Sequence, residues 1–123
     1  MAAAGTWQGF SGSTITLPMA WIYIVAGGVF EAAWALALKE SHGFSRLWPT
    51  AAFLAALVVS MVLLGLGLRS LPVGTGYAVW VGIGAVGAAV GGVLLYGEGT
   101  EAARMLPIAL IGVGVVWLAL GES

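Results

Sequence analysis

The sequence contains no cysteine and a single histidine. Without cysteine the chain has no disulfide bond, no thiolate metal site and no cysteine nucleophile. One histidine is too few for a histidine-ligated metal site. We therefore expect no metal, no bound cofactor and no enzymatic site.

Charge is also scarce. Only 7% of the 123 residues are charged, whereas soluble domains carry about 25%. The net charge of -1 leaves no basic patch for a nucleic-acid backbone. A soluble enzyme, a nucleic-acid-binding protein and a disordered linker are excluded. The 61% hydrophobic content and the mean hydropathy of +1.07 indicate an integral membrane protein.

Apolar stretches are what the chain has in abundance. A membrane-spanning helix needs about 20 mostly apolar residues, and short polar or Gly/Pro-containing loops divide this chain into segments of that kind. We predict an all-α, multi-pass bundle of four transmembrane helices forming one transporter domain over residues 19–123. The predicted spans are residues 19–38, 48–68, 73–96 and 105–120.

Residues 1–18 differ from the rest because they contain Gly, Ser and Thr but no charge. A signal peptide would begin with a basic region followed by an apolar one, and neither is present. We expect either a disordered N-terminal tail or an over-long translation start, with Met19 as the true beginning.

The basic residues give only a weak orientation signal. Lys39, Arg46 and Arg104 fall in loops on one side of the membrane, and Arg69 falls on the other. The positive-inside rule then leaves two alternatives open, a modest preference for one orientation or insertion in both. Transporters commonly pair two related halves across a pseudo-two-fold axis. This chain has no internal repeat, so dimerisation would supply the missing half, and an antiparallel dimer would reproduce an inverted repeat.

Glu31 is the one acidic residue deep inside a predicted span. A charge at that depth costs a few kcal/mol on insertion scales, so the carboxyl group either faces a cavity, where it exchanges protons, or stays neutral as interhelical hydrogen-bond glue. Gly27 and Gly28 on the same helical face leave space beside it, and Trp34 lies one turn further along that face.

The third predicted span carries an ordered face. Small residues there allow close helix packing, and two aromatic residues beside an acidic site suit a cation. This face consists of Tyr77, Trp80, Gly84, Gly87 and Gly91. Ser60, the polar residue deep in the second span, either bonds back to its own helix or holds the Glu31 carboxylate.

From Met19 onward the chain resembles the small multidrug resistance family of four-helix bacterial exporters. The matching features are the glutamate of the first span, Glu31, and the stretch RSLPVGTGYAVW of residues 69–80. Within the family it is most similar to the guanidinium exporter subtype. That similarity rests on Trp34 three residues after the glutamate, on the loop HGFSR of residues 42–46 and on GIGAVGA of residues 82–88.

This resemblance implies an antiparallel homodimer in the bacterial inner membrane that exports guanidinium and small substituted guanidinium ions in exchange for protons. The proton gradient is then the energy source. Glu31 becomes the shared proton and substrate site. Residues matching those that surround it are Trp34, Ser60, Tyr77 and Trp80, and residues of the fourth span that help to hold the dimer are Gly112 and Gly114.

Three positions depart from the subtype, namely Ala119 in place of a lysine, Val81 in place of a threonine and Gly76 in place of an alanine. Two alternatives stay open. One is an exporter of quaternary ammonium or aromatic cations from the same family. The other is a non-transporting membrane subunit in which Glu31 serves as structural glue.

Overall fold

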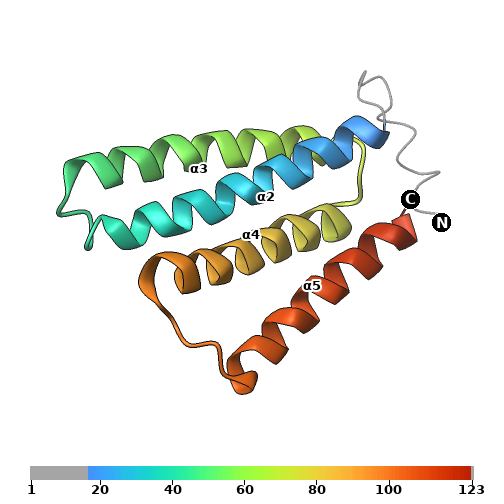
Figure 1. The fold of residues 1–123 in the computed structure, drawn as a ribbon. Helices are drawn as coiled ribbons and strands as arrows, with labels where there is room; N and C mark the ends of the chain where they lie inside the picture. Colours follow the sequence, from blue (N-terminus) through green and yellow to red (C-terminus); the bar gives the residue numbers. More distant parts are fainter. Residues whose placement is uncertain (1–16, 123) are drawn as a thin grey trace.

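The structure, a computed structural model, describes residues 17–122. These residues form helices, and helices that follow one another in the sequence run antiparallel and are joined by short connections (Figure 1). Each helix is long and apolar enough to cross a membrane, which confirms the prediction of an all-helical protein with four potential spans. The helices are α2 (Leu17–Glu40), α3 (Leu47–Gly67), α4 (Val73–Tyr96) and α5 (Ala102–Glu122).

The helix ends follow from local sequence. Pro72, which has no backbone N–H to contribute, directly precedes α4, and Gly97 ends that helix in the left-handed conformation with φ of 63°. Helix α4 has the predicted bounds, and α3 begins and ends one residue earlier than predicted. Helices α2 and α5 extend beyond the predicted spans, and α5 begins at Ala102 rather than at residue 105. Of the predicted tail, residues 17 and 18 belong to α2 and the remainder lies outside the described residues.

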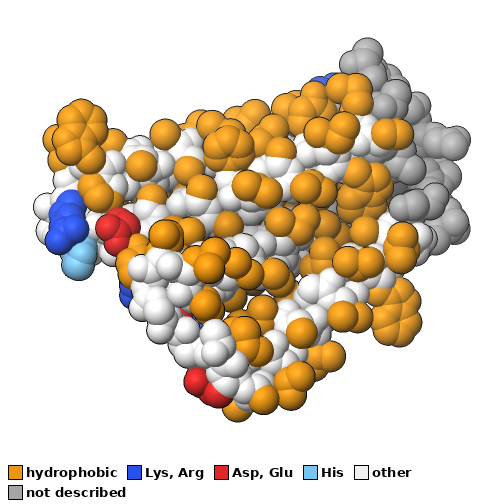
Figure 2. Space-filling view, viewed as in Figure 1, with side chains coloured by type: hydrophobic (Ala, Val, Ile, Leu, Met, Phe, Trp, Pro, Cys, Tyr) orange, Lys and Arg blue, Asp and Glu red, His pale blue; other side chains and the backbone are white. Residues whose placement is uncertain are grey.

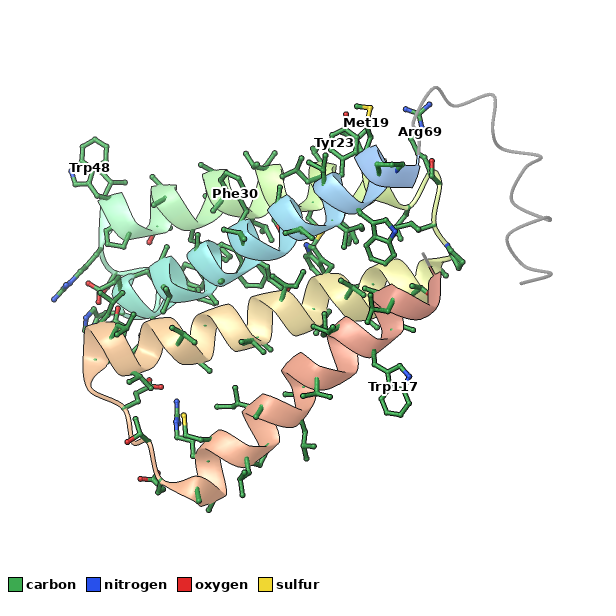
Figure 3. All side chains as sticks on the ribbon, turned by 45° about the vertical axis from the view of Figure 1, so that its right-hand side comes forward. Met19, Tyr23, Phe30, Trp48, Arg69 and Trp117 are labelled. Atoms are coloured by element: carbon green, nitrogen blue, oxygen red, sulfur yellow. The ribbon has the colours of Figure 1, made fainter. Side chains whose placement is uncertain are left out.

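The outer surface of the helices is apolar. Figure 2 shows hydrophobic side chains over most of the visible face, with charged groups gathered near the helix ends. Trp48 and Trp117 project away from the bundle (Figure 3) and are 80% and 76% exposed, and Phe30 is 40% exposed. Exposure on this scale would cause aggregation in water, so these faces suit a lipid environment.

The buried core is small and lies near the α3–α4 turn, where the first three described helices meet. Helix α2 packs against both α3 and α4, and Gly67 allows α3 to approach the Ile24 side chain of α2 closely. The buried apolar residues of this cluster are Ala20, Ile24, Leu64, Leu71, Val79 and Trp80.

Helix α5 packs against α4 and against no other described helix. Figure 1 shows the two helices close together near the end of α5 and diverging towards its start. The close approach is at Gly82, where a Cβ atom would overlap the Val115 side chain. None of the apolar window of α5 is buried, so this helix is attached along one side only.

A polar contact joins the C-terminal ends of α2 and α4. Tyr96 donates a hydrogen bond to the Glu40 carboxylate, and the Lys39 ammonium lies 5.0 Å from the centroid of the Tyr96 ring. These groups hold together the ends of α2, which carries Glu31, and of α4, which the Glu31 side chain faces.

Candidate functional site

Glu31 lies near the middle of α2 and faces α4. Its carboxyl group lies directly over Gly84, because a Cβ atom built at position 84 would overlap the Glu31 side chain from Cγ to Oε1. Only glycine leaves room for the carboxyl group at this point of α4. The sequence-predicted residues Glu31 and Gly84 are therefore brought into direct contact.

Helices α2 and α4 stay close together along three glycines of α4. We call Gly84, Gly87 and Gly91 the glycine seam. At each of these positions a Cβ atom would lie within 3 Å of an α2 side chain, at Gly87 that of Ala32 and at Gly91 that of Leu36. From the α2 side, Gly28 makes room for Ile83 in the same way. Small residues on both helices thus set the α2–α4 distance.

Ser60 connects three helices. Its hydroxyl donates a 2.7 Å hydrogen bond to the backbone carbonyl of Gly27 in α2 and accepts a 3.0 Å bond from Trp80 Nε1 in α4. The side chain is completely buried. Ser60 therefore bonds neither to its own helix nor to the Glu31 carboxylate, the two alternatives that the sequence left open, and instead fixes the helices around the carboxylate.

Two polar atoms one helical turn apart on α2 have no hydrogen-bond partner within the described chain. They are Glu31 Oε1 and Trp34 Nε1, both buried. An unsatisfied polar group at membrane depth costs several kcal/mol. A free acceptor and a free donor placed together here suit a polar ligand or a second copy of the chain.

Tyr77 of α4 is 52% exposed. Its ring centroid is 5.3 Å from that of Trp80, with the ring planes tilted by 42°. Faces of such rings attract cations. Gly112 and Gly114, in contrast, lie on α5 and are not brought near Glu31; a Cβ atom at Gly114 would meet nothing within 4 Å.

Sequence reasoning missed Phe53 of α3, whose ring packs edge-on against Trp34 with centroids 5.7 Å apart. The signal was available, since Phe53 precedes Ser60 by seven residues and two helical turns place both on one face. Within residues 17–122, no group of three or more His, Cys, Asp or Glu side chains is arranged to hold a metal ion.

Replacing Ser60 by alanine should destabilise the bundle. Ser60→Ala removes the acceptor of the buried Trp80 N–H and the donor to the Gly27 carbonyl, which we expect to cost about 1–2 kcal/mol of unfolding free energy. Titration of the purified protein with sodium dodecyl sulfate measures this. Ser45→Ala, which removes a hydroxyl bonded within its own exposed loop, is the control. Equal losses in both variants would contradict the role assigned to Ser60.

Comparison with known proteins places this arrangement in a family. Residues 19–111 match the profile described as Small Multidrug Resistance protein. A guanidinium exporter of Escherichia coli strain K12 is 51% identical over 102 residues, which cover 83% of this chain and 97% of the relative.

Guanidinium exporters of Citrobacter freundii and Salmonella typhimurium are 50% identical with the same coverage. The match includes all of α2, α3 and α4 from Met19 onward, and with them Glu31, the glycine seam and the Ser60 contacts. With its four potential spans and relatives half identical over nearly their whole length, the chain belongs to the Small Multidrug Resistance family.

Proposed function

We propose that this protein exports guanidinium and small substituted guanidinium ions in exchange for protons, as an antiparallel homodimer in the bacterial cell membrane. The observation that carries the proposal is the Glu31 carboxyl group, held at membrane depth against Gly84 with a buried oxygen that has no partner in the described chain. The relatives named guanidinium exporters support the same substrate.

The chemistry of guanidinium fits these groups. Guanidinium is a planar cation whose N–H donors pair with a carboxylate in bidentate fashion. Removing its water is costly, so the site must return both charge and hydrogen-bond acceptors. Glu31 supplies the charge, and the aromatic rings of Trp34, Tyr77 and Trp80 supply faces that attract a cation.

Exchange follows from competition for one group. A proton neutralises the Glu31 carboxylate and removes the attraction for the cation, whereas a bound cation occupies the oxygens to which the proton would add. A dimer that carries either ligand, but not both, couples the outward flux of cation to the inward flux of protons. The proton gradient is then the energy source, and no cofactor is required.

A second copy of the chain completes the pathway in this proposal. One chain presents a single Glu31 on a bundle whose α5 is attached along one side only, and it contains no related second half. In an antiparallel dimer two Glu31 carboxylates share the site and titrate as a coupled pair.

The alternative of Glu31 as structural glue is less well supported. Interhelical glue requires a hydrogen bond to another helix. Among residues 17–122, the buried Oε1 of the Glu31 carboxyl group has no hydrogen-bond partner. The interhelical hydrogen bonds around it are made by Ser60 instead.

Glu31→Gln should abolish guanidinium binding and the coupled release of protons. Glutamine preserves the size of the side chain but cannot ionise. Binding to the wild type should weaken as pH falls, since the site attracts the cation only while the carboxylate is ionised, and by up to about tenfold per pH unit for each proton displaced. Calorimetric titration of the purified protein across pH measures both effects.

The matched control is Glu101→Gln, which changes an exposed carboxylate in the loop before α5 and should bind guanidinium as the wild type does. If Glu31→Gln binds guanidinium with an affinity independent of pH, the carboxylate is structural and the exchange mechanism is wrong.

Selectivity should favour small guanidinium ions over bulky aromatic cations. Trp34 packs against Phe53, and Trp80 packs against Tyr77, and we expect these ring pairs to leave only a small space beside Glu31. Guanidinium should therefore displace tetraphenylphosphonium in a competition assay with protein-containing vesicles, while the reverse displacement should be weak. Equal transport of both ions would favour the multidrug alternative within the family.

Dual insertion gives a distinct labelling pattern, and the chain contains no cysteine to interfere. Ser45 lies in the α2–α3 loop and Ser70 in the α3–α4 turn, at opposite ends of α3. In the proposed arrangement the variants Ser45→Cys and Ser70→Cys therefore place their thiols on opposite sides of the membrane. A membrane-impermeant thiol reagent added outside intact cells should label about half of each variant, as insertion in both orientations requires. Complete labelling of one variant and none of the other would exclude the antiparallel dimer.

A further inference from the structure

Three aromatic rings form a continuous chain from the site to the α2–α3 loop. The Trp34 ring of α2 contacts Phe53 of α3 edge-on, with a centroid distance of 5.7 Å and an interplanar angle of 73°. Phe53 in turn contacts Phe44 of the loop, with a centroid distance of 5.8 Å. Each such pair lies within the favourable range of aromatic contacts. We call Trp34, Phe53 and Phe44 the aromatic chain.

The loop end of the aromatic chain has an unusual backbone. His42, Gly43 and Phe44 all have positive φ, with 69° at Phe44. This left-handed conformation is unfavourable for a bulky L-residue. Such conformations persist where the surroundings determine them, and they cluster at functional sites.

Buried Ser41 determines the loop conformation. Its hydroxyl donates a 2.6 Å bond to the Leu38 carbonyl at the end of α2 and accepts a 3.1 Å bond from the Phe44 N–H. Its carbonyl accepts backbone bonds from Ser45 and Arg46, and the residue is completely buried. These bonds hold the Phe44 backbone in the conformation from which its ring contacts Phe53.

We propose that Phe53 is a positioning residue for Trp34, supported from the loop by Phe44. The indole N–H of Trp34 is buried and has no hydrogen-bond partner in the described chain, so nothing polar fixes the direction of that ring. The edge contact with Phe53 fixes it instead. The inference rests on the proposed function, in which Trp34 contacts the bound cation beside Glu31.

The position of Phe53 supports this assignment. Phe53 and Ser60 share the face of α3 that is directed at α2, and Ser60 bonds to Gly27, which precedes Trp34 by two turns on the same helix. One face of α3 therefore holds α2 at two points, through a hydrogen bond at Gly27 and through an aromatic contact at Trp34.

Two measurements on the full-length protein test the proposal. In detergent micelles, the six tryptophans give separate indole N–H signals by ¹⁵N NMR, and Trp34→Phe identifies the signal of Trp34 by its loss. Phe53→Leu should shift that signal, and Phe44→Leu should shift it less. Phe53→Tyr, which retains the ring, should leave it close to its wild-type position.

Guanidinium binding is measured by calorimetry on the same variants. Phe53→Leu should weaken binding roughly two- to tenfold, the range set by one aromatic contact, while the dependence of binding on pH stays as in the wild type. In a Trp34→Phe background the same change should have little further effect, because Phe53 acts through Trp34. Phe53→Tyr should bind guanidinium with an affinity close to that of the wild type.

The control is Phe30→Leu, the same substitution at an exposed position of α2, which should change neither the Trp34 signal nor the affinity. An unshifted Trp34 signal in Phe53→Leu would overturn the proposal, as would a loss of affinity that is undiminished in the Trp34→Phe background. If the wild type binds no guanidinium, the proposed function is wrong, and the indole signal still decides whether Phe53 positions Trp34.

Discussion

The contact between the Glu31 carboxyl group and the backbone of Gly84 is the constraint on which the rest of the structure depends. A carboxyl group inside an apolar bundle needs space on the neighbouring helix. Glycine provides that space because it has no Cβ atom, which at position 84 would overlap the Glu31 side chain. The glycine seam then continues the close approach of α2 and α4 to Gly91. The contacts that set the distance between α2 and α4 are consequently the same contacts that position the Glu31 carboxyl group.

Helix α3 fixes the orientation of α2 and α4 and does not provide the space for the Glu31 carboxyl group. Ser60 bonds to both neighbours of α3, and hydrogen bonds of this kind restrict rotation of a helix more than apolar contacts do, because they require particular distances and angles. Gly27 of α2 and Trp80 of α4 bond to the same Ser60 hydroxyl. A rotation of α2 would therefore also disturb the bond between α4 and α3, and a rotation of α4 would disturb the bond between α2 and α3. The site therefore tolerates concerted movement better than independent movement of one helix.

Much of the fold could be predicted from where charges are absent. Apolar stretches of sufficient length between Lys39, Arg69 and Glu98 leave few arrangements other than four spans, and the period of Tyr77, Trp80 and Gly84 already indicated a face of α4. The chain also indicated that Glu31 is special, because a lone carboxylate at that depth is costly.

Contacts between helices were harder to predict, because they depend on the rotation of each helix about its axis. The sequence places Ser60 within α3 but does not tell which helix receives its bond. The spacing of Phe53 and Ser60 places both on one face of α3, but it does not tell that the Phe53 ring contacts Trp34. The hydrogen bond from Tyr96 to Glu40 could not be predicted either, because its two partners are far apart in the sequence. The start of α5 at Ala102 differs from the prediction because two alanines and Arg104 continue the helix before its long apolar part, and alanine and arginine both favour helices.

The one-sided attachment of α5 has a consequence for how the protein is made. Chains emerge from the ribosome N-terminus first, and completed units fold as they appear. The contacts among α2, α3 and α4 include Glu31, the glycine seam and Ser60, and none of them involves α5. The part of the chain that forms the site can thus assemble in the membrane while α5 is still being synthesised, and the last helix joins a three-helix unit that is already in place.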